Sequence, residues 1–83
     1  MKTTAKLLER ITYNPAIFGG KPIIRGQRLA VEHVLGMLAD GATHQELLEA
    51  YPFLEEADIQ ACLLFAKTQI ANEYFEPLAV TGS

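Results

Sequence analysis

The first residues that could do chemistry are Gly19-Gly20-Lys21. Glycine followed by lysine is typical of a phosphate-binding loop, in which backbone N–H groups and the lysine hold the phosphates. A Walker A loop needs a glycine five residues before its second glycine, and Ser or Thr after the lysine. Here Pro15 and Pro22 occupy those two positions. The stretch therefore predicts a turn with positive φ that exposes Lys21.

The metal-binding and nucleophilic side chains form no site that the sequence can identify. His33 and His44 are eleven residues apart without a ligand at metal-binding spacing, so they are expected to be surface histidines. Cys62, the single cysteine, falls on the apolar stripe of a helix and is expected to pack in the core. The only serine, Ser83, ends the sequence. We expect no metal, no cofactor and no small-molecule substrate.

The carboxylates have structural explanations rather than catalytic ones. Glu55, Glu56 and Asp58 suit the first turn of a helix, where the macrodipole favours negative charge. Glu46 fits a capping box with Thr43. Because no acid–base pair remains, we expect no enzymatic activity.

Charge is divided unevenly along the 83 residues. Residues 1–28 carry six basic residues and one acidic residue, a net +5, whereas residues 29–83 carry one basic and nine acidic residues, a net −8. Such asymmetry suggests that the first part contacts a polyanion. Lys21, Arg25 and Arg28 are the best candidates for phosphate contacts with DNA. The alternative is a solvated basic surface, or ion pairs with the acidic half.

The elements that must position these residues are two short strands followed by helices. Residues 10–13 and 22–25 read as strands, separated by turn signals. Val31, Val34, Leu35 and Leu38 have helical spacing, and Gly41 fits the C-terminal cap. A short second helix follows Thr43, and a third is expected from near Glu55 to about Phe75.

This pattern predicts a mostly α fold, with three helices in a helix-turn-helix arrangement and a short N-terminal β-element. We expect a single domain over residues 1–83. Its parts are a β-element with basic turns (9–30), a three-helix bundle (31–76) and a flexible tail (77–83). The sequence shows neither a membrane span nor a signal peptide, and its single cysteine excludes an internal disulfide, so we expect the cytoplasm.

The third helix is apolar on two sides. At 100° per residue, Ile59, Cys62, Leu63, Ala66 and Ile70 form the expected core stripe. The opposite side is also largely apolar, so either the N-terminal strands or another protein must cover it. The residues expected at such an interface are Ala61, Leu64, Phe65, Ile70, Tyr74, Phe75 and Leu78. We expect a homodimer, with short strands that pair across a two-fold axis.

The segments Gly19–Gly26, Arg28–Val31, Leu38–Gly41 and Tyr51–Leu54, in this order and spacing, resemble domain-of-unknown-function family 433. The resemblance covers roughly residues 8–67. It implies a homeodomain-like three-helix fold behind an N-terminal β-segment. The sequence departs from the family pattern at Gln27 and Glu55, where threonine and a hydroxyl residue are common.

The resemblance also implies a function. Family members are often interpreted as antitoxins of the VapB class, encoded beside a toxin that resembles a PIN-type ribonuclease. We therefore expect a toxin partner encoded by an adjacent gene, and binding to the operon's own promoter DNA. The alternatives are a homodimeric DNA-binding regulator without a toxin, and a purely structural dimer.

Overall fold

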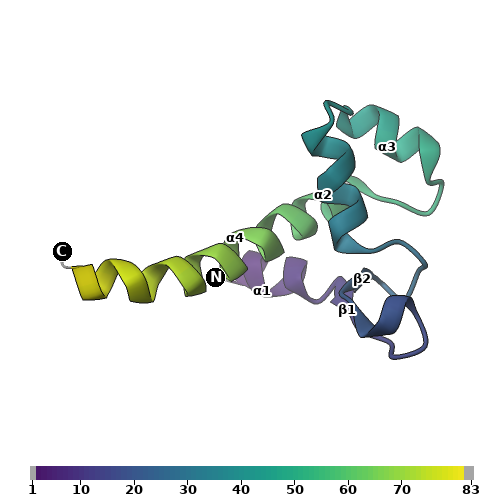
Figure 1. The fold of residues 1–83 in the computed structure, drawn as a ribbon. Coiled ribbons are helices and arrows are strands. Elements are labelled where there is room, and N and C mark those ends of the chain that lie inside the picture. Colours follow the sequence, from purple (N-terminus) through teal and green to yellow (C-terminus); the bar gives the residue numbers. More distant parts are fainter. Residues whose placement is uncertain (1, 82–83) are drawn as a thin grey trace.

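The computed structural model describes residues 2–81, and the side chains of residues 5–71 among them. The elements are α1 (Lys2–Leu8), β1 (Ile11–Thr12), a 3-10 turn η1 (Phe18–Gly20), β2 (Ile23–Ile24), α2 (Val31–Ala39), α3 (His44–Ala50) and α4 (Glu56–Thr81) (Figure 1). The mostly helical fold with a small β-element is confirmed. Helix α1 was not expected.

The β-element is an antiparallel pair in which Ile11 lies opposite Ile24 and Thr12 lies opposite Ile23. Ile23 also forms a bridge with Ala30, so β2 has partners on both sides within its own chain. Ile23 and Ile24 are completely buried. Strand β2 is thus paired on both sides within the chain, whereas β1 is paired with β2 on one side, and pairing of strands across a two-fold axis stays a prediction.

The expected turn chemistry is present at three places. Gly19 and Gly20 have φ of 64° and 87°, and Gly41, which follows α2, has φ of 99°. Thr43 Oγ1 accepts from the Glu46 N–H at 3.1 Å, and Glu46 Oε1 accepts from the Thr43 N–H at 2.8 Å, so the capping box at the start of α3 is confirmed.

The core lies where α2, α3 and α4 meet the β-element. Its fully buried members include Ile24, Leu29, Val34, Leu47 and Ile59. Cys62 is buried among them, as expected, and burial raises the pKa of its thiol to about 12. Leu7 of α1 packs against the same cluster, which places α1 alongside α4 (Figure 1).

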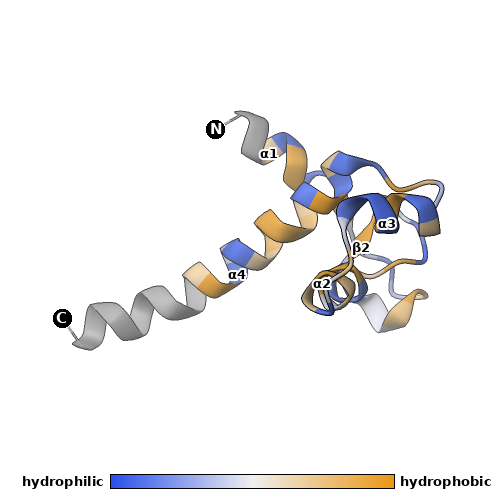
Figure 2. Cartoon of the chain, turned by 90° about the horizontal axis from the view of Figure 1, so that it is seen from above, coloured by the Kyte–Doolittle hydropathy of each residue, from blue (hydrophilic) through white to orange (hydrophobic). Residues whose placement is uncertain are grey.

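Helix α4 continues to Thr81, past residue 76, where the bundle was expected to end. The described part of α4 carries hydrophobic residues along most of its length, interrupted by polar ones (Figure 2). Within the described chain, no helix combines the length and the apolar character that a membrane span requires.

Candidate functional site

The three cations expected to contact DNA have different surroundings. Lys21 is exposed and its Nζ lies 3.1 Å from a carboxylate oxygen of Glu32. Arg25 is half-buried and binds Asp58. Arg28 is exposed, and no carboxylate among the described side chains lies within ion-pair distance of it. The alternative of ion pairs with the acidic half thus holds for Lys21 and Arg25.

Asp58 is the centre of a buried ionic cluster that the sequence did not reveal. Its carboxylate is completely buried. Arg25 donates to both oxygens, from Nε at 2.9 Å and from the terminal nitrogen at 2.7 Å. Arg10 donates to Oδ1 at 3.0 Å, and the Glu55 N–H donates to Oδ2 at 2.8 Å. The bidentate geometry is the strong form of an arginine–carboxylate pair.

The cluster joins three distant parts of the chain. Arg10 follows α1, Arg25 follows β2, and Asp58 stands in the first turn of α4. Arg25 also donates to the carbonyl oxygen of Phe53 at 2.7 Å, and Arg10 also binds Glu55 at 2.8 Å. Asp58 thereby locks the β-element to the start of α4 and caps that helix. We interpret the cluster as structural, because its carboxylate is hydrogen-bonded on both oxygens and closed to solvent.

Opposing effects act on the pKa of Asp58. Burial alone would raise this pKa, but the hydrogen bonds from Arg25, from the Glu55 N–H and from Arg10 together hold it below its ordinary value. The ionised carboxylate is therefore favoured more in the folded chain than in the unfolded one. Its contribution to stability is present above the unfolded pKa, about 3.9, and is lost as the pH falls through the folded pKa.

This linkage predicts how the free energy of unfolding depends on pH. The difference between the wild type and Asp58→Asn, measured by urea unfolding, should be constant near neutral pH and shrink below about pH 4. The asparagine side chain does not titrate. The other carboxylates titrate in both proteins, so their contributions cancel when the two free energies of unfolding are subtracted. A difference that stays constant down to pH 2 would contradict the proposed role of the Asp58 charge.

Arg25 also occupies a strained backbone position. Its φ is 43°, that of Gly26 is 73°, and the Gln27 N–H donates to the Ile24 carbonyl at 2.7 Å. Positive φ at both central residues defines a type I′ turn, in which a non-glycine residue costs about 1 kcal/mol. The turn is held because the Arg25 side chain is bound to Asp58 and Phe53.

The buried side of α4 differs from the expected one. Leu63 and Ile70, expected in the core, are 45% and 62% exposed. Asp58 and Ala61 are completely buried instead, and Phe65 packs against the core. The buried face is rotated by about 90° from the apolar stripe. The reason is Asp58, which turns inward because two arginines satisfy it there.

The expected interface residues separate accordingly. Ala61 is buried in the core of its own chain, which corrects its placement at an interface. Leu64 and Phe65 are half-buried, whereas Ile70 is exposed. The side chains of Tyr74, Phe75 and Leu78 lie outside the described residues.

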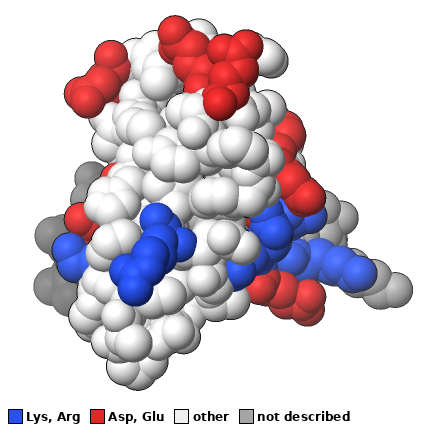
Figure 3. All heavy atoms as spheres, turned by 90° about the vertical axis from the view of Figure 1, so that its right-hand side faces the viewer, with Lys and Arg blue, Asp and Glu red and all other residues white. Residues whose placement is uncertain are grey.

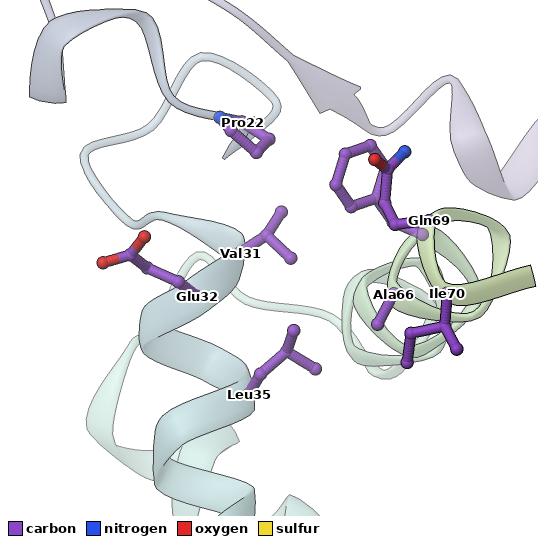
Figure 4. A pocket seen from close by; sticks show the side chains of 8 residues that line it. Pro22, Val31, Glu32, Leu35, Ala66, Gln69 and Ile70 are labelled. Atoms are coloured by element: carbon purple, nitrogen blue, oxygen red, sulfur yellow. The ribbon is translucent and has the colours of Figure 1, made fainter. Parts of the chain in front are cut away.

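An open apolar groove of about 270 Å³ lies between α2 and α4. Val31 and Leu35 of α2 point toward Ala66 and Ile70 of α4 across it (Figure 4). Pro22, Glu32, Phe65 and Gln69 complete its lining. An apolar groove beside an exposed apolar stripe is typical of a protein-binding surface.

Several carboxylates lie at the α3 end of the molecule. Figure 3 shows Asp and Glu side chains at this end without Lys or Arg beside them, and a mixture of acidic and basic side chains lower on the same face. Asp40, Glu46 and Glu49, all exposed, belong to α3 and the turn before it. We name these three residues the acidic corner.

His44 Nδ1 lies 2.6 Å from a carboxylate oxygen of Glu56, and the described residues contain no metal-binding cluster.

The sequence of this chain matches a known protein family over most of the fold described above. The sequence model of a family described as "Protein of unknown function (DUF433)" matches residues 11–66. The chain belongs to this family. The DUF433 match contains Arg25, Asp58 and the acidic corner. It excludes α1, Arg10 and the part of α4 from Lys67 onward.

Two relatives of this DUF433 chain are similar over most of its length. A crystal structure of a DUF433 member protein from Anabaena variabilis matches with a TM-score of 0.70 and 29% identity, over 87% of this chain and 74% of that one. The uncharacterized protein y4eO of Sinorhizobium fredii is 36% identical over 59 residues, which are 71% of this chain. The match spans only 27% of that relative's length.

Proposed function

We propose that this DUF433 chain is an antitoxin-like binding protein that masks the basic, RNA-binding face of a PIN-like ribonuclease toxin. The observation that carries the proposal is the acidic corner at the α3 end. Residues 29–66, which include all of α2 and α3, contain no lysine or arginine. A ribonuclease needs a basic surface for its anionic substrate, so a protein with this charge distribution is complementary to it.

Two further features support a binding role. The apolar groove and the exposed Ile70 provide an apolar surface for contact with protein. The relative y4eO matches over about a quarter of its own length, which agrees with a module that serves as one part of a larger protein. The toxin itself is inferred from the family resemblance, and the charge distribution agrees with it.

The geometry favours a protein partner over promoter DNA. Arg25 is held by the buried carboxylate of Asp58, whereas Lys21 lies beside Glu32 in an exposed ion pair. Duplex phosphates would also meet the carboxylates of the acidic corner on the same face (Figure 3). Lys21 and Arg28 together offer little of the phosphate neutralisation that non-specific DNA binding needs.

The proposal predicts a complex with the product of the adjacent gene. The two proteins, co-expressed and passed through a sizing column at micromolar concentration, should elute together. In the variant Asp40→Lys/Glu49→Lys the dissociation constant should rise about tenfold or more at low salt, because two attractive charges become repulsive.

The matched control is Glu9→Lys, which makes the same kind of charge reversal in the exposed segment after α1, away from α3. It should leave the affinity nearly unchanged. If the wild-type proteins elute separately, the proposed function is wrong. If the control weakens binding as much as the double variant, the acidic corner is not the contact surface.

A further inference from the structure

Helix α4 presents an apolar stripe that its own domain leaves uncovered. Leu63 and Ile70 are 45% and 62% exposed, and Ala66 lies between them. At 100° per residue, and with Ile59 at zero, these three residues fall within about 40° of one line along the helix. The small side chain of Ala66 at the centre leaves room for a second helix to approach closely.

The surroundings of this stripe have a definite order around the helix. On one side, toward Gln69, lies the chain's own α2, with the groove between them (Figure 4). On the other side, at about 80° from Ile59, lies the exposed Lys67. A helix that packs on the stripe would therefore touch α2 on one flank and leave Lys67 on the other.

We propose that the occupant of this groove is helix α4 of a second copy of the chain, packed parallel to it about a two-fold axis that runs along the two helices. In this arrangement each α4 lies on the Leu63–Ala66–Ile70 stripe of the other copy and along its groove, against the half-buried Leu35. By symmetry, Lys67 of each copy then faces α2 of the other copy, which carries Glu32. Two identical ion pairs therefore form across one isologous interface.

The charged residues beside the stripe favour a second copy of the chain over a helix with basic flanks. Glu32 on α2 lines the groove, with Lys21 bound to it, and Lys67 lies on the opposite flank of the stripe. A helix with basic flanks would meet both of these lysines, whereas a second copy brings one carboxylate to each Lys67. The pair of Glu32 and Lys21 is 59% and 55% exposed, so the Glu32 carboxylate can exchange partners at little cost. The acidic corner takes no part, so this inference goes beyond the proposed function.

The first experiment measures the oligomeric state of the full chain by sedimentation equilibrium between 1 and 100 µM. The wild type should be a dimer at the upper concentrations. Ile70→Asp should raise the dimer dissociation constant at least about 30-fold, because it places a charge within the apolar contact. Helicity by circular dichroism verifies that the variant is folded, since Ile70 is largely exposed in the monomer.

The second experiment reverses the charges. Glu32→Lys and Lys67→Glu should each weaken the dimer several-fold, because each creates two like-charged contacts. An equimolar mixture of these two variants should form a heterodimer as tight as the wild-type dimer, since every contact then joins opposite charges. A monomeric wild type at 100 µM, an intact Ile70→Asp dimer, or a mixture no tighter than its components would each overturn the proposal.

Discussion

Asp58→Ala should lower the free energy of unfolding by about 3–5 kcal/mol, the usual cost of breaking a buried ion pair from one side. The change removes the acceptor of four hydrogen bonds, from Arg25, Arg10 and the Glu55 N–H. It also removes the hydrogen bond by which Asp58, the third residue of α4, accepts from the Glu55 N–H just before the helix. Urea unfolding at pH 7, followed by circular dichroism, measures this loss against a total stability that is about 5–15 kcal/mol for natural domains.

The matched control is Glu55→Gln, in the same cluster. Glu55 binds Arg10 at 2.8 Å, but its side chain is 59% exposed, so an effect below about 1 kcal/mol is expected. If Asp58→Ala costs no more than Glu55→Gln, the buried cluster is not what holds the β-element to α4.

Local chemistry made much of this fold predictable. The capping box of Thr43 and Glu46, the glycine turns and the spacing of Val31 and Val34 each involve residues within a few positions of one another. They identified α2 and α3, and the acidic residues from Glu55 to Asp58 identified the start of α4. Helix α1 escaped because seven residues are too few to show periodicity and too few to be stable alone. It is stabilised by packing against α4, which lies some 50 residues later in the chain.

The rotation of α4 shows why the candidate interface was only partly predictable. A helical wheel assumes that apolar residues point inward, and on that basis Leu63 and Ile70 belonged to the core. The decisive residue is polar, and its partners Arg10 and Arg25 are distant in sequence. One signal was present: Asp58, Cys62 and Phe65 have i, i+4, i+7 spacing, which places the carboxylate on a line of buried residues. Because the helix macrodipole already explained a carboxylate at this position, Asp58 was not considered as a buried residue.

Arg25→Ala should destabilise the chain as much as Asp58→Ala does, by about 3–5 kcal/mol, because it leaves a completely buried carboxylate with Arg10 as its only cation. Arg28→Ala, at the neighbouring exposed arginine, should change stability by less than about 0.5 kcal/mol. The comparison separates a structural arginine from a free one. Equal effects at the two positions would contradict the difference in their surroundings.

Arg25→Gly is a further control, because it removes the same side chain but relieves the positive φ of 43°. It should be about 1 kcal/mol less destabilising than Arg25→Ala, since glycine adopts this conformation without a steric penalty. If glycine and alanine are equivalent, the backbone strain at this turn is negligible.

The double variant Arg25→Ala/Asp58→Ala tests whether the two residues act on each other. If Arg25 and Asp58 contributed independently to stability, the losses in the free energy of unfolding caused by the two single changes would add. Because each single change leaves a charge without its main partner, the double variant should instead be more stable than the sum predicts by about 1–3 kcal/mol. The instability of Arg25→Ala also affects how DNA binding is measured. The DNA affinities of this variant and of the wild type have to be compared under conditions in which the same fraction of each protein is folded. Removing Arg25 lowers the stability of the fold that also carries Arg28, and a smaller folded fraction would by itself reduce DNA binding.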